Sequence, residues 1–118
     1  MIAIVDDDEA VRRAVASLVR SLGYSAAAFG SAEEFLQPEK ISGISCLITD
    51  LQMPGLSGLD LQDRLIAKGH RIPIIFLTAH GDESVRARAM KAGAVGFLSK
   101  PCNNDHLVDC LEKALKAA

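Results

Sequence analysis

Five polar side chains are spaced along the sequence so that they could form one phosphoryl-transfer site. Asp6 and Asp7 follow a short apolar run, and Asp50, Thr78 and Lys100 each follow a later one. Carboxylates that meet in one crevice repel one another unless a cation lies between them. Oxygen ligands suit Mg²⁺, which takes one or two carboxylates together with phosphate oxygens. A lysine and a hydroxyl beside that cation would complete a site that works by positioning and charge neutralisation, with an aspartate as acceptor.

Each of these residues has a simpler explanation when it is taken alone. The acidic run at 6–9 could be a solvated segment in which Asp7 or Asp8 caps a helix. Asp50 could be a turn residue, Thr78 an ordinary strand-end threonine and Lys100 a surface lysine. Their common placement after apolar runs, in this order, favours a shared site.

The elements that would position these residues alternate along the chain. Apolar residues at 11, 15, 18 and 22 form one helical stripe, and similar patterns separate the other apolar runs. Such alternation is typical of a parallel sheet with helices on both faces. We predict an α/β, flavodoxin-like fold: a doubly wound, five-stranded parallel sheet of order 2-1-3-4-5 with five helices. The predicted strands are 2–5, 25–29, 46–49, 74–77 and 95–98.

This strand order places a ligand crevice beyond the carboxyl ends of the first and third strands. The predicted aspartates follow those two strands. Helix signals agree with the alternation: Ser31 and Glu34 form a capping-box pattern that predicts one short helix, and Asp82 is a predicted N-cap. Asn103 or Asn104 is predicted to cap the last helix.

Length and composition exclude several classes of protein. The chain has 118 residues, 49% hydrophobic and 24% charged, which predicts one domain over residues 1–118 without an effector domain. A net charge of −2 provides no basic field for nucleic acid. The longest apolar run, 72–79, is far shorter than a membrane span of about 20 residues. We expect a cytoplasmic protein with no membrane contact, whose three cysteines are reduced.

Together these motifs resemble the receiver domain of two-component response regulators, the family that includes CheY. The resemblance covers essentially the whole chain. It is carried by Val-Asp-Asp at 5–7, Asp-Leu-Gln-Met-Pro at 50–54 with Gly58, Thr-Ala at 78–79 and Lys-Pro at 100–101. The stretches 78–82 and 89–94 further resemble the FixJ-like branch, whose members usually carry a DNA-binding domain. DNA contact would then occur only through an effector domain.

The resemblance implies a role for each matching residue. Asp50 would accept a phosphoryl group from a phosphohistidine of a sensor histidine kinase or phosphotransferase. Asp7, Asp50 and the backbone carbonyl of Gln52 would bind Mg²⁺, with Asp6 acting largely through a metal-bound water. Lys100 would pair with the phosphate.

Further matches would transmit the signal. Thr78 would donate its hydroxyl to the phosphoryl group, beside the small Ala79. Phe97 would then rotate inward and change the surface of the fourth helix, fifth strand and fifth helix, although it could be a simple core aromatic. A cis bond before Pro101 would aim Lys100 into the crevice.

Two variable positions, Gln52 and His80, would tune the lifetime of the acyl phosphate. Cys102 departs from the phenylalanine that the family often has there. Opposite charges predict a homodimer on phosphorylation, although both sets could simply be solvated; they are Arg86, Arg88 and Lys91 on one side and Asp105, Asp109 and Glu112 on the other.

Three other functions remain open from the sequence. A Mg²⁺-dependent phosphohydrolase could use an aspartate nucleophile in the acidic run at 6–8, although a larger chain is expected for that class. A flavin carrier would need a phosphate loop where this chain has acids. A receiver used only as a binding scaffold would not need Asp7, Asp50, Thr78 and Lys100 together.

Overall fold

The computed structural model describes residues 1–79, 81–100 and 103–116. Within them, five parallel strands form one sheet of order β2-β1-β3-β4-β5, as the sequence predicts. The strands are β1 (Ile2–Val5), β2 (Ala26–Phe29), β3 (Cys46–Thr49), β4 (Ile74–Thr78) and β5 (Gly96–Ser99). β1, β3 and β4 are buried at every position, which explains their continuous apolar sequence.

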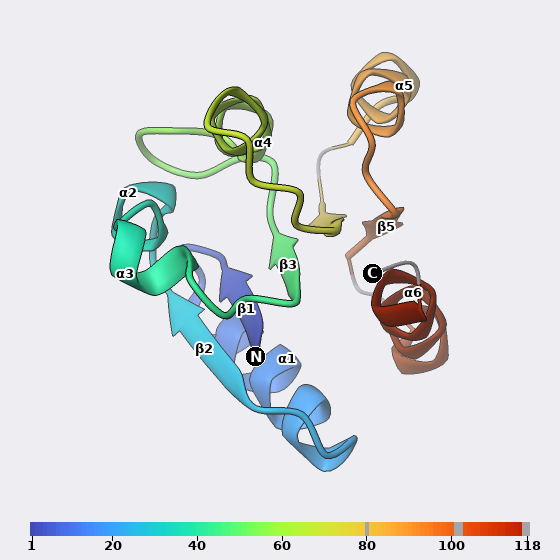
Figure 1. The fold of residues 1–118 in the computed structure, drawn as a ribbon. Coiled ribbons are helices and arrows are strands. Elements are labelled where there is room, and N and C mark those ends of the chain that lie inside the picture. The colour runs from blue at the N-terminus through green and yellow to red at the C-terminus, as the bar shows by residue number, and fades with distance from the viewer. Residues whose placement is uncertain (80, 101–102, 117–118) are drawn as a thin grey trace.

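Helices cover both faces of the sheet (Figure 1). α1 (Glu9–Ser21) and α6 (Asn104–Lys116) pack on one face, and four helices pack on the other: α2 (Ala32–Phe35), α3 (Pro38–Ile41), α4 (Gly58–Ala67) and α5 (Glu83–Lys91). Two hydrophobic clusters therefore lie on opposite sides of the strands. The predicted flavodoxin-like architecture is confirmed.

The predicted number of helices is wrong, because the described residues form six rather than five. The single short helix expected after Ser31 is split into α2 and α3. Pro38 starts α3, and the residue before it, Gln37, is extended at φ −71° and ψ 129°. A proline disfavours helical backbone in the preceding residue, so one continuous helix cannot form there.

Helix caps agree closely with the sequence. Asp8, not Asp7, caps α1 by accepting from the backbone N–H groups of Ala10 and Val11. Asp82 caps α5 through the Val85 N–H. The Asn103 side chain accepts from the Asp105 N–H at 2.7 Å, at the start of α6.

Two cysteines lie in the described part of the chain, and both Cys46 and Cys110 are free thiols. Burial raises the pKa of the Cys46 thiol to about 12. The prediction for Cys102 lies outside the described residues. No helix of the described part combines the length and apolar character needed to cross a membrane.

Candidate functional site

The registers of the strands bring the predicted acids to one edge of the sheet. Val5 pairs with Thr49, so the next residues, Asp6 and Asp50, leave adjacent strands at the same level. The Asp50 N–H donates to the Val5 carbonyl at 3.1 Å, which continues this pairing by one residue. Parallel strand pairing thus places residues 44 positions apart in one crevice.

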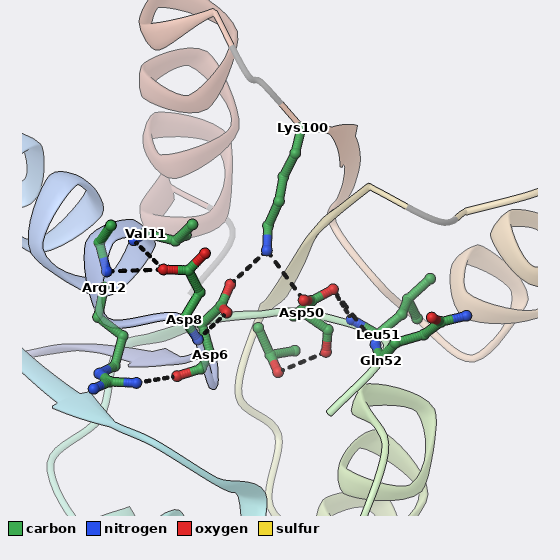
Figure 2. Close-up of polar contacts among 10 residues, drawn as sticks. Asp6, Asp8, Val11, Arg12, Asp50, Leu51, Gln52 and Lys100 are labelled. Carbon is green, nitrogen blue, oxygen red and sulfur yellow. Dashed lines mark hydrogen bonds and ion pairs between the residues drawn. The ribbon is translucent and has the colours of Figure 1, made fainter. Parts of the chain in front are cut away.

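Lys100 joins the two carboxylates from the far side of the crevice (Figure 2). Its N–H donates to the Thr78 carbonyl at 2.8 Å, which fixes the backbone of Lys100 at the end of β5. Its Nζ lies 2.8 Å from Asp6 Oδ2 and 3.0 Å from Asp50 Oδ2. The side chains of Asp6 and Asp50 are only 4% and 10% exposed, so this ammonium group offsets part of the negative charge of two carboxylates that water reaches poorly.

Burial and charge act in opposite directions on these groups. Burial raises the pKa of Asp6, and its hydrogen bonds from Lys100 and Asp8 only partly offset that effect. Burial lowers the pKa of Lys100, but its hydrogen bonds to Asp6 and Asp50 outweigh burial and leave the pKa above its ordinary value. Lys100 therefore stays protonated and remains a fixed positive charge in the crevice.

Backbone amides orient the Asp50 carboxylate. Its Oδ1 accepts from the Leu51 N–H at 2.7 Å, with the Gln52 N–H further away at 3.4 Å. Lys100 binds the other oxygen, Oδ2. Each carboxylate oxygen of Asp50 thus has a partner of its own, and the side chain is held in one orientation.

Carboxylate oxygens of Asp6, Asp7 and Asp50 lie within 4.8 Å of one another. Asp6 and Asp50 are buried, whereas Asp7 is exposed. Three carboxylates with no softer ligand among them match the preference of Mg²⁺ for oxygen. The residues present therefore fit the predicted cation.

Of the remaining predicted residues, three lie in or directly after β4 and β5, and two are not among the described residues. Thr78 is buried at the end of β4. Ala79 and Lys100 line the same cavity. Phe97 lies on β5, with its ring 6.0 Å from that of Phe76. His80 and Pro101 lie outside the described residues, so their predicted roles stay predictions.

Sequence reasoning missed two contacts around the site. Arg12 Nη1 donates to the Asp6 carbonyl at 2.7 Å and so holds the end of β1 from the α1 side (Figure 2). Gly58 lies so close to the Asp50 carbonyl that an added Cβ would come within 2.1 Å of its oxygen. Gly58 belongs to the motif at 50–58 that carries the family resemblance, whereas nothing in the local sequence pattern around Arg12 indicated its contact with Asp6.

Comparison with known proteins agrees with this geometry. The model of the family described as "Response regulator receiver domain" matches residues 2–112. The chain belongs to this family. As a receiver domain of a two-component response regulator, it is consistent with a switch controlled by phosphorylation.

Named relatives of this receiver domain are regulators. The response regulator protein TodT of Pseudomonas putida is 48% identical over 118 residues, covering 100% of this chain and 52% of the relative. The transcriptional regulatory protein FixJ of Bradyrhizobium diazoefficiens is 38% identical over 117 residues, covering 99% and 57%. The receiver domain spans about half the length of these relatives.

Solved structures resemble this receiver domain closely. The response regulator StyR superposes with a TM-score of 0.90 at 43% identity, covering 98% of this chain and 59% of that one. The structure titled FixJ-N gives a TM-score of 0.87 at 36% identity, covering 99% and 94%. The family and the fold predicted from the sequence are confirmed.

Proposed function

We propose that Asp50 is the phosphoacceptor of this receiver domain. The observation that carries the proposal is the bridge from Lys100 Nζ to both Asp50 and Asp6. A carboxylate oxygen of Asp50 forms a P–O bond to the phosphoryl group of a phosphohistidine, the P–N bond breaks, and the imidazole leaves. The ammonium group of Lys100 neutralises charge on the phosphoryl oxygens during this transfer.

Mg²⁺ would be held by Asp6, Asp7 and Asp50, with Asp6 acting largely through water and with the backbone carbonyl of Gln52 as a further ligand. The bound cation supplies positive charge that neutralises the phosphoryl oxygens. Asp6 is nearly buried and its pKa is raised, so its proton competes with the cation at low pH. Cation binding should therefore weaken as the pH falls.

We propose that Thr78 and Phe97 transmit the change. The Thr78 hydroxyl would move toward the phosphoryl group, with Ala79 small enough to leave room for the donor. Support comes from the loop that follows β4: a Cβ on Gly81 would lie 2.5 Å from the Phe97 ring and 3.1 Å from the Thr78 methyl group. Thr78 and Phe97 thus share one packed space, so a shift of one affects the other. Gln52 and His80 remain the proposed lifetime-tuning residues.

A groove beside the site suits the incoming donor protein, a sensor histidine kinase or phosphotransferase. Its volume is about 450 Å³. It lies between α1 and α6 and is mainly apolar, and Lys100 is one of its lining residues. The apolar lining includes Val11, Ala14, Val15, Leu18, Leu77 and Leu107. A helix of the donor packed into this groove would bring its phosphohistidine to Asp50.

The output that we propose is control of transcription in the bacterial cytoplasm. FixJ is named a transcriptional regulatory protein. A homodimer through α5, β5 and α6 would join the exposed basic residues of α5 to the exposed acids of α6. Arg88 already pairs with Asp63 at 3.0 Å, so the partner subunit would have to compete with this internal ion pair. DNA binding would belong to an effector domain.

Intact mass after incubation with acetyl phosphate and Mg²⁺ tests the assignment. We expect one phosphoryl group on the wild type and none on Asp50→Asn. The control is Glu39→Gln, which removes an exposed carboxylate of α3 and should accept phosphoryl like the wild type. Modification that persists in Asp50→Asn would refute the assignment. Sustained turnover of a phosphate monoester would instead support the alternative, a Mg²⁺-dependent phosphohydrolase with an aspartate nucleophile.

A further inference from the structure

A carboxylate outside the site holds the loop that follows Asp50. The Leu56 N–H donates to Glu33 Oε1 at 2.8 Å, across 23 residues of sequence. Glu33 lies on α2, beside the edge strand of the sheet, whereas Leu56 lies in the loop between β3 and α4. This bond therefore joins the segment between β2 and β3 to the loop between β3 and α4, the loop that directly follows Asp50.

The loop backbone is shaped to receive this carboxylate. Gly55 adopts φ +80°, a left-handed conformation that residues with a Cβ rarely adopt. A Cβ at Gly55 would lie 2.7 Å from Glu33 Oε1 and 3.2 Å from Oε2. The carboxylate thus lies directly over the glycine, in space that a side chain would fill. The Leu56 bond also holds the pKa of Glu33 below its ordinary value.

The helix that carries Glu33, α2, is held in place by buried side chains and an N-cap. Its neighbours on α2, Ala32 and Phe35, are both fully buried, and the Phe35 ring packs edge-on against Phe29 at 5.4 Å. Ser31 caps the helix by accepting from the Glu34 N–H. A bond from Glu33 therefore ties the loop to the hydrophobic core.

The loop itself begins with the groups that orient Asp50. The Leu51 and Gln52 amides point at Asp50 Oδ1, and the Gly58 N–H closes the loop by donating to the Leu51 carbonyl at 2.8 Å. Among the described residues outside the loop, Glu33 is the one whose side chain bonds to the backbone of 53–56. Between its fixed ends the loop is held by the packing of Met53 and Leu56 against the core and by this bond from Glu33.

We infer that Glu33 is a positioning residue of the phosphoacceptor site: it fixes the loop that carries Gln52 and so sets the affinity for Mg²⁺ and the lifetime of the phosphoryl group on Asp50. The inference rests on the proposed function of Asp50 and Gln52. Glu33 acts through the backbone and does not touch the reacting atoms.

Three variants separate the hydrogen bond from other roles of the side chain. Glu33→Met keeps the length of the side chain but has no acceptor. Glu33→Gln keeps an acceptor oxygen without the charge. Glu39→Met is the matched control, because Glu39 is an exposed glutamate on the neighbouring helix α3. Circular dichroism and thermal unfolding of each variant establish that it is folded.

The measurements are calorimetric titration with MgCl₂, amide hydrogen exchange at Leu56, and the rate of phosphoryl loss after acetyl phosphate is removed. We expect Glu33→Met to bind Mg²⁺ about threefold to tenfold more weakly, since an exposed hydrogen bond to a charged group is lost. Exchange at Leu56 should accelerate and the phosphoryl lifetime should change. Glu33→Gln should stay within about twofold of the wild type, because its acceptor oxygen is retained.

Unchanged Mg²⁺ affinity and phosphoryl lifetime in Glu33→Met would overturn the inference, even if Leu56 exchanges faster. A Glu33→Gln variant as defective as Glu33→Met would overturn it too, because the acceptor would then not be the deciding feature. If Glu33→Met does not fold, Glu33→Gln and Glu33→Asp decide, since the shorter aspartate should fail to reach Leu56. Failure of wild-type Asp50 to accept phosphoryl would refute the proposed function alone, while Mg²⁺ affinity and Leu56 exchange still test Glu33.

Discussion

Replacing Gly58 with alanine should damage both the fold and the site, because the new methyl group would collide with the backbone of Asp50. The added Cβ would lie 2.1 Å from the Asp50 carbonyl oxygen and 3.1 Å from Leu51 Cα. Contacts of a Cβ below 3.0 Å are essentially never seen, so α4 and the end of β3 must separate by about 0.9 Å. Neither neighbour is a flexible side-chain end that could rotate away.

The energetic cost follows from this geometry. Overpacking costs about 1–3 kcal/mol, and a backbone neighbour favours the upper end of that range. Alanine recovers up to about 1 kcal/mol of helix propensity at the first residue of α4. We expect a net loss of about 2 kcal/mol, which corresponds to a fall in Tm of roughly 8 °C for a chain of this size.

The same displacement should also slow the phosphorylation of Asp50. The carbonyl that must move belongs to Asp50 itself, so its carboxylate leaves the geometry set by Leu51 and Lys100. Phosphorylation by acetyl phosphate should slow at least tenfold, as a misplacement of about 1 Å can cost up to a hundredfold. Thermal unfolding and intact mass over time measure the two effects.

Gly30→Ala is the control for Gly58→Ala. An added Cβ at Gly30 would meet its nearest atom, Arg12 Nη1, at 3.6 Å, which is ordinary contact. Its Tm and phosphorylation rate should therefore stay close to those of the wild type. If Gly58→Ala unfolds at the temperature of Gly30→Ala and is phosphorylated as quickly, the close approach of α4 to Asp50 is not a constraint, and the reasoning is wrong.

The sequence predicted the sheet and the placement of the acids because both depend on local pattern. Apolar runs that end in a polar residue mark the carboxyl ends of buried strands, and parallel pairing then brings those ends together. Asp6 and Asp50 follow such runs directly and Lys100 follows one after Ser99, so their convergence needed no knowledge of loop conformation.

What the sequence did not predict depends on backbone geometry in loops and short helices. The split between α2 and α3 had a visible signal in Pro38, but the capping-box pattern at Ser31 and Glu34 favoured one helix. In the structure Glu34 Oε2 accepts from the Gly30 N–H instead of the Ser31 N–H. The bond from Glu33 to Leu56 joins segments whose proximity only the folded chain establishes.

Three further predictions test the buried groups and the proposed switch. Cys46 is buried and the pKa of its thiol is raised to about 12, so iodoacetamide near neutral pH should label it only when the protein unfolds. Peptide mass measures the labelling, and rapid labelling of Cys46 in the native protein would contradict its burial. Gly81→Ala should lower the free energy of unfolding by only about 0.5–1.5 kcal/mol, because the Phe97 ring can rotate away from the new methyl group. The chemical shifts of that ring should change, and unchanged shifts would show that Phe97 does not contact residue 81. Asp6 has a pKa above its ordinary 3.8, so the folded state keeps this proton to higher pH than the unfolded chain. The stability from this protonation is complete below 3.8 and is lost as the pH rises through the raised pKa. Urea unfolding without Mg²⁺, from pH 3.8 upward, should therefore show the free energy of unfolding of the wild type falling relative to that of Asp6→Asn as the pH rises. A difference that stays constant with pH would show that burial does not raise the pKa of Asp6.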